Sequence, residues 1–148
     1  MIEIIRDEQV LAYIVRSGFH RDGVVFFTPN DYSQQLGYMS HPAGHQIVPH
    51  IHKKITRAVT VTNEVLFVKN GKLRVDFYSE QNDYLESRVL ERGDCILLVS
   101  GGHGFEALED VQLVEVKQGP YIGESDKERI PAVSKKDIRF GDDRLGKH

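Results

Sequence analysis

The sequence is poor in features that would place it outside a cell or in a membrane. It has a single cysteine, Cys95, among 148 residues, so no internal disulfide can form. No apolar run approaches the roughly 18 residues that a membrane-crossing helix needs. Glu3, Asp7 and Glu8 interrupt the apolar N-terminus, which argues against a secretory signal. We therefore expect a cytoplasmic protein in which Cys95, within "DCILLV", is a small buried hydrophobic residue.

Basic residues are not in excess either. The net charge is -3, so no broad positive field favours nucleic acid. Hydrophobic residues make up 40% and charged residues 28%, which is ordinary for a globular chain. A chain of this length buries enough surface for one domain with its own core. The composition thus predicts a protein that binds neither nucleic acid nor a membrane.

Short β-branched and aromatic segments alternate with turn signals along most of the chain. These segments are 23–28, 34–40, 58–68, 72–79, 86–90, 93–99 and 111–118. "KNGK" is a hairpin signal, and "SGGHG" is interpreted as a loop. Only residues 7–16 have a helical period. The pattern predicts an all-β sandwich or barrel.

Three of the seven histidines lie in "AGHQIVPHIHKK". His50 and His52 are two residues apart, so in an extended segment their side chains point to one face, about 7 Å apart at the backbone. Two imidazoles at this spacing can converge on one transition-metal ion. The alternative is a polar surface edge, and the pair alone does not decide between them.

Glu64 and His103 are candidates for the remaining ligands. Glu64 interrupts the Val- and Thr-rich run 58–68, where a carboxylate costs several kcal/mol unless it is paired or binds metal. His103 follows an apolar segment and is flanked by glycines that allow a sharp turn. For Glu64 the plain alternative is an ion pair with Arg57 or Lys69. Glu115 and Lys117 alternate with Leu113, so they face either the interior or solvent.

These residues resemble the two motifs of the cupins, a superfamily of small β-barrels. Gly44, His50, His52, Glu64 and Gly71 follow the order of the first motif. Gly93-Asp94, "CILLV" and "SGGHG" follow the second, and the resemblance covers roughly residues 35–120. It implies a cupin-type β-barrel (a double-stranded β-helix, or jelly roll). It also implies one divalent transition metal (Mn, Fe, Ni, Co or Zn) bound by His50, His52, Glu64 and His103.

Two departures from the cupin motifs bear on the site. Eleven residues separate His52 from Glu64, which is longer than the usual spacer of the family. Either a loop is inserted and Glu64 remains a ligand, or Glu64 has another role. In the second motif, Ser100 stands where the family has proline.

An open coordination position on such a metal would make the site catalytic. The cupin resemblance favours an enzyme acting on a small polar, sugar-like metabolite, of isomerase or epimerase type, with His50, His52 and Glu64 as catalytic residues. "HIHKK" and "GPYIGESDKERI" also resemble the nucleotide-sugar ketoisomerase branch, in which His50 or His52 would carry a proton without metal. The alternatives are an iron-dependent cupin dioxygenase and a non-catalytic module that binds a small ligand.

The expected organisation has three parts. Residues 1–34 hold N-terminal strands and a possible short helix, 35–122 the cupin barrel, and 123–148 a charged C-terminal tail or arm. Ile2, Ile4 and Ile5 lie outside both motifs and could pair with a partner's sheet edge, which predicts a homodimer.

Overall fold

The computed structural model describes residues 1–141, and within them the chain divides into two compact units. Unit 1 comprises residues 1–19 and the described chain from residue 61 onward, and unit 2 comprises residues 20–60. Unit 1 consists mainly of strands and unit 2 contains one pair of short strands. Within residues 1–141, the only helical elements are the 3-10 turns η1 (Gly123–Asp126) and η2 (Lys135–Asp137). The predicted all-β class is confirmed. None of the described sheets closes into a barrel.

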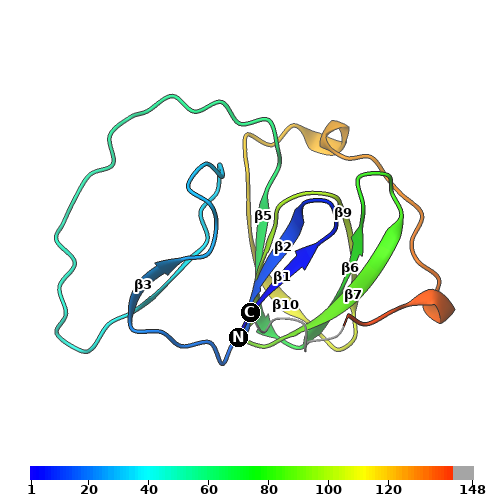
Figure 1. Ribbon diagram of the computed structural model, residues 1–148, viewed down its shortest axis with the longest axis horizontal. Helices are drawn as coiled ribbons and strands as arrows, with labels where there is room; N and C mark the ends of the chain where they lie inside the picture. The colour runs from blue at the N-terminus through cyan, green and yellow to red at the C-terminus, as the bar shows by residue number, and fades with distance from the viewer. Residues whose placement is uncertain (142–148) are drawn as a thin grey trace. The chain divides into compact units, whose positions relative to one another are not determined.

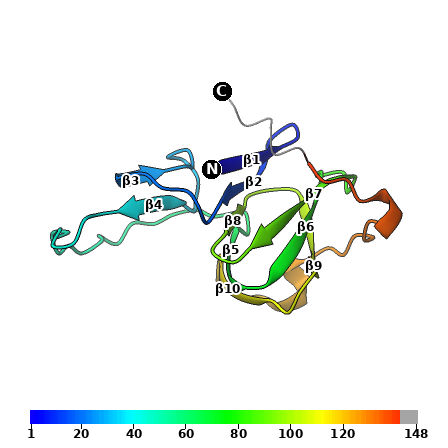
Figure 2. The ribbon, with the colours of Figure 1, turned by 90° about the horizontal axis from the view of Figure 1, so that it is seen from below.

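Unit 1 contains two antiparallel sheets. The larger has the strand order β1 (Ile2–Arg6), β2 (Val10–Val15), β8 (Cys95–Leu98), β5 (Glu64–Asn70) and β10 (Gln112–Lys117). The smaller has the order β7 (Tyr84–Glu91), β6 (Lys72–Tyr78) and β9 (Gly102–Ala107). In both views of the ribbon, the smaller sheet lies on one side of unit 1 and the larger sheet on the other (Figures 1 and 2).

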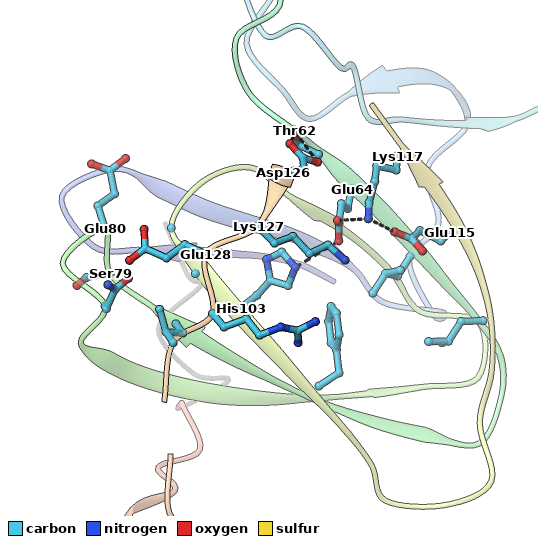
Figure 3. Close-up of a pocket in the computed structure, with 18 residues that line it drawn as sticks. Thr62, Glu64, Ser79, Glu80, His103, Glu115, Lys117, Asp126, Lys127 and Glu128 are labelled. Carbon is cyan, nitrogen blue, oxygen red and sulfur yellow. Dashed lines mark hydrogen bonds and ion pairs between the residues drawn. The ribbon is translucent and has the colours of Figure 1, made fainter. Parts of the chain in front are cut away.

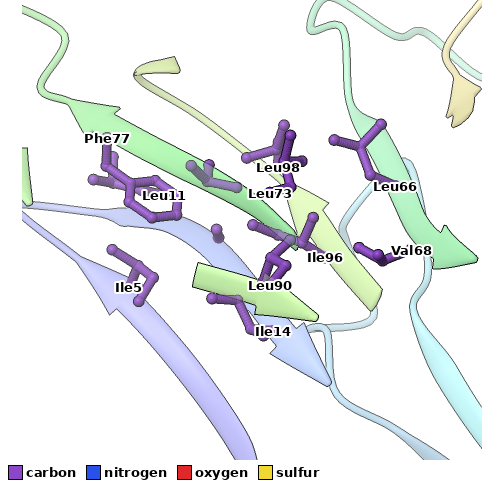
Figure 4. Packing of buried hydrophobic residues seen from close by; sticks show 12 residues of the cluster. Ile5, Leu11, Ile14, Leu66, Val68, Leu73, Phe77, Leu90, Ile96 and Leu98 are labelled. Atoms are coloured by element: carbon purple, nitrogen blue, oxygen red, sulfur yellow. The ribbon is translucent and has the colours of Figure 1, made fainter. Parts of the chain in front are cut away.

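The core of unit 1 lies between these sheets. The larger sheet contributes Ile14, Leu66 and Ile96, and the smaller contributes Phe77 and Leu90, all at most 4% exposed (Figure 4). Each strand points alternate side chains inward, so one apolar face from each sheet is removed from water. Burying a side chain of this size contributes about 1.5–3 kcal/mol, so the core holds the two sheets together.

The helix predicted within residues 7–16 is wrong, because Val10–Val15 forms β2 in the larger sheet. Five of its six residues are buried, so both faces of the strand are covered and the apolar residues run without alternation. β-Branched Val10, Ile14 and Val15 also favour a strand. The loop predicted at "SGGHG" is wrong from Gly102 onward, because β9 begins at that residue.

The other predicted strands agree with the structure to within a few residues. The turn predicted at "KNGK" is present at Gly71, which has a φ of 80° and connects β5 to β6. The predicted hairpin is wrong, because β5 pairs with β8 and β10 in the larger sheet and β6 pairs with β7 and β9 in the smaller one. A Cβ at Gly71 would lie 2.0 Å from the carbonyl oxygen of Asp110, so only glycine fits the turn. The run 58–68 contributes a strand only from Glu64 onward.

Unit 2 contains one hairpin, formed by β3 (Gly23–Phe26) and β4 (Gly37–Ser40). Residues 41–60 follow without helix or strand. The buried apolar cluster of the described chain contains no residue from unit 2. Val24, Phe26 and Met39 on the hairpin are each more than half exposed.

Residues 123–141 form an arm, defined here as the described chain after Ile122. Ser87 and Phe140 form a parallel bridge, so the arm adds to the free edge of β7. The amide of Ser87 donates to Arg139 O at 2.8 Å, and the Tyr84 hydroxyl accepts from the Arg139 amide at 2.9 Å. The predicted charged tail is therefore docked over this range. Its last residues, 142–148, lie outside the described chain. No described helix has the length and apolarity needed to cross a membrane.

Candidate functional site

A pocket of about 1050 Å³ lies in unit 1, where β9 and β10 form the neighbouring edges of the two sheets. β5 contributes Glu64 and Leu66, β9 contributes His103 and Phe105, and β10 contributes Lys117 together with Leu113 and Glu115. The opposite side of unit 1 lies between β1 and β7. There Glu3 lies 3.4 Å from Arg88.

The arm supplies a further wall of the pocket, which the sequence did not predict. Its lining residues are Asp126, Lys127, Glu128, Arg129 and Ile130. Thr62 Oγ1 donates to Asp126 Oδ1 at 3.2 Å, and the Val133 amide donates to the Tyr78 hydroxyl at 3.0 Å. The one sequence signal for this segment was the faint resemblance of "GPYIGESDKERI", which ends at Ile130, to the ketoisomerase branch.

Glu64 and His103 meet inside this pocket. Oε2 of Glu64 lies 3.2 Å from Nε2 of His103 (Figure 3). Glu64 begins β5 and His103 is the second residue of β9, so the two sheets position one residue each. The sequence predicted this neighbourhood from the two cupin-like motifs, and the structure brings these two residues together.

Lys117 is the third charged member of the group. The register of the larger sheet places Lys117 directly opposite Glu64, with Nζ 2.7 Å from Oε1. Glu115 Oε1 lies 3.1 Å from the same ammonium. Lys117 therefore holds one carboxylate oxygen of Glu64 while His103 holds the other. Lys117 and Glu115 both line the pocket, although the Glu115 side chain is 46% exposed, and Lys117 rather than Lys69 is the cation paired with Glu64.

These contacts fix the charge of Glu64. The hydrogen bond from His103 and, after it, that from Lys117 lower its pKa to about 2, although burial acts in the opposite direction. The hydrogen bond to Glu64 is also the largest cause that raises the pKa of Lys117. Glu64 is thus a carboxylate and Lys117 an ammonium at neutral pH.

The ionised carboxylate also fixes the tautomer of a neutral His103. A carboxylate only accepts hydrogen bonds, so Nε2 of His103 carries the proton. Nδ1 then has a free lone pair, and no residue in 1–141 forms a hydrogen bond with it. The arrangement can therefore accept a proton at Nδ1 and stabilise the resulting imidazolium through Glu64.

His50 and His52 belong to unit 2 and lie in the segment without strands. Their rings are 5.1 Å apart, edge to face, and both residues are exposed. Nδ1 of His50 lies 2.9 Å from the carbonyl oxygen of Val48, which leaves its Nε2 as the acceptor. The two imidazoles are close to each other, as their spacing predicted.

The unit 1 residues do not fit a transition metal by themselves. Glu64 and His103 offer two donor atoms, and the Lys117 ammonium already occupies one side of the carboxylate. Within residues 1–141, no group of three or more His, Cys, Asp or Glu side chains is placed to hold a metal ion. Cys95 is no candidate, because burial raises the pKa of its thiol to about 11.

The sequence and the structure were compared with known proteins. No family model, no curated protein and no solved structure gives a match.

Proposed function

We propose that this protein is an acid–base enzyme that isomerises or epimerises a small, polar, sugar-like metabolite in the unit 1 pocket. The observation that carries the proposal is the Glu64–His103 pair, 3.2 Å apart inside a pocket large enough for a sugar derivative. The glutamate orients the imidazole and His103 acts as the general base. Polar groups on several sides suit a ligand rich in hydroxyls.

The chemistry follows from the free Nδ1 of His103. It removes a proton from the carbon next to a carbonyl group, and the electron pair of the broken C–H bond forms an enediolate. Returning a proton, which can first exchange with solvent at Nδ1, to the neighbouring carbon, with a proton shift between the oxygens, completes an isomerisation. Returning a proton to the other face of the original carbon completes an epimerisation. His50 or His52 is the proposed second proton carrier, in line with the ketoisomerase resemblance.

Turnover of a panel of keto sugars and nucleoside diphosphate sugars, followed by NMR, tests this proposal. His103→Gln should reduce turnover by about 10²-fold or more, the usual contribution of a general base. His20→Gln is the matched control, since His20 is exposed in unit 2 and contacts only the exposed Asp22 and the Tyr38 hydroxyl among the hydrogen bonds and ion pairs of residues 1–141. Undiminished turnover in His103→Gln would contradict the proposed role.

A metal-dependent cupin is the second candidate function. The favouring observation is the 3.2 Å separation of Glu64 Oε2 and His103 Nε2. Adjacent ligands of one ion have about this separation when each bond is about 2.0–2.2 Å. His50 and His52 would be the further ligands, which gives the four-ligand set of the cupin resemblance. A metal bound in this way would serve either a metal-dependent isomerase or an iron-dependent dioxygenase.

Metal analysis of protein purified without a histidine tag separates these candidates. A metal-dependent cupin should contain about one transition-metal ion per chain, and this content should be lost on changing His50, His52 or His103 to Ala. Iron with oxygen uptake would favour the dioxygenase. Metal without oxygen uptake would favour a metal-dependent isomerase, and ligand binding without turnover would favour a binding module.

A further inference from the structure

Three cationic residues line the pocket, and they differ in how their charge is balanced. Lys117 lies between the carboxylates of Glu64 and Glu115. Arg129 lies 2.8 Å from Glu124 through Nη2. No residue in 1–141 forms an ion pair with Lys127. Its positive charge is therefore available to a ligand.

The backbone around Lys127 is held in place on the arm. The Lys127 amide donates to Glu124 O at 3.2 Å and closes the turn of η1. Asp126, the preceding residue, accepts from Thr62 next to β5. Ile130 lies so close to Gly102 that a Cβ there would be 2.9 Å from its Cδ1. The arm thus keeps the residues on both sides of Lys127 close to the strands of the pocket.

The side chain of Lys127 extends from the arm into the pocket. Figure 3 shows it on the side where His103 and Glu64 lie. A proton acceptor and an unbalanced ammonium thus face the same space, and they come from β9 and from the arm. Lys117 cannot take the same part, because two carboxylates already hold its ammonium.

We propose that Lys127 binds the substrate oxygen that becomes negative when His103 removes a proton. This inference rests on the proposed isomerase function and adds a residue and a ligand class to it. Proton removal next to a carbonyl moves negative charge onto the carbonyl oxygen, and an ammonium beside that oxygen stabilises the charge. The site should therefore prefer planar, oxygen-rich anions that resemble an enediolate.

Oxalate, a planar dianion with the oxygen arrangement of an enediolate, is a direct probe of this site. Calorimetry would give its affinity, and NMR of the His103 ring signals would show where it binds. We expect wild-type protein to bind oxalate with a shift of the His103 signals. Lys127→Met should weaken binding about tenfold or more, and Lys127→Arg should keep most of it, because a close charge pair is lost only in the first.

Lys136→Met is the matched control, since Lys136 is an exposed cation on the same arm outside the pocket. It should bind oxalate as wild type does. Equal affinity in Lys127→Met, a loss of the same size in Lys136→Met, or no oxalate binding by wild type would each overturn the proposal. Failure of the proposed function has a different signature: His103→Gln would retain turnover even where oxalate binding depends on Lys127.

Discussion

At the scale of single residues, Glu64 links the stability of the fold to the chemistry of the site. Its pKa of about 2 lies below the ordinary value of 4.5, so the folded state favours the carboxylate. This stabilisation is fully present above pH 4.5 and is lost as the pH falls towards 2. Glu64→Gln should lower the free energy of unfolding by about 1–2 kcal/mol at pH 7, discounted because the pocket is open to solvent.

Denaturant unfolding between pH 7 and pH 2 measures this effect. The difference in the free energy of unfolding between wild type and Glu64→Gln should shrink as the pH falls from 4.5 towards 2. Glu128→Gln, at the exposed wall of the same pocket, should differ from wild type by less than about 0.5 kcal/mol at every pH. If the curves for wild type and Glu64→Gln run parallel, Glu64 is not held by His103 and Lys117 in the way described.

Part of the candidate site could be predicted from the sequence, but not the residues whose position depends on contacts far away along the chain. Glu64 and His103 were identified because a carboxylate in an apolar run and a histidine between glycines both stand out locally. Lys117 was an open alternative, since alternation on a strand does not say which face is covered. Lys127 gave no signal, because its position depends on how the arm docks far from its neighbours in sequence.

At the scale of elements, the arm depends on contacts with β7. The Tyr84 hydroxyl lies 2.8 Å from Ser87 Oγ and donates to Arg139 O at 3.1 Å. Tyr84→Phe removes these bonds and leaves the buried Ser87 hydroxyl with one partner fewer, which should cost about 1 kcal/mol. Hydrogen exchange should then be faster in residues 131–141, while the core strands keep their protection.

Tyr121→Phe is the control for this change, because Tyr121 precedes the arm and is 79% exposed. Its exchange pattern should match that of wild type. Unchanged protection of the arm in Tyr84→Phe would mean that the hydroxyl does not hold it against β7.

Elements with regular alternation and clear turns were predicted well, as for β6 and the turn at Gly71. The pairing at that turn was not, because the turn connects the two sheets and does not join two paired strands. β2 was mistaken for a helix because it is covered on both faces, which removes the period-two signal. β9 was taken for a loop because three glycines surround His103 in "SGGHG", and glycine is unfavourable in strands unless pairing supports it. In both cases the neighbouring strands, which lie far away in sequence, decide the conformation.

At the scale of the whole molecule, we predict a homodimer that pairs through β1. β1 is an edge strand of the larger sheet, and Ile4 is 42% exposed there, whereas Ile5 is 3% exposed and belongs to the core. Of the three predicted contact residues, Ile5 is therefore unavailable to a partner. Ile4→Lys places a charge on the exposed edge and should shift the protein to a monomer, because edge lysines oppose strand pairing.

Light scattering at tens of micromolar measures this assembly. Wild type should have twice the mass of the chain, and Ile4→Lys should approach the 16.9 kDa of one chain. A monomeric mass for wild type would contradict the predicted dimer.

The most direct test of the central claim, that His103 removes a proton from a sugar-like substrate, is deuterium uptake from heavy water. Wild type, incubated in D₂O with the panel of keto sugars and nucleoside diphosphate sugars, should place deuterium on the carbon next to the carbonyl of its substrate. His103→Gln should leave that carbon unlabelled. Equal labelling by both proteins, or no labelling of any sugar by wild type, would contradict the account.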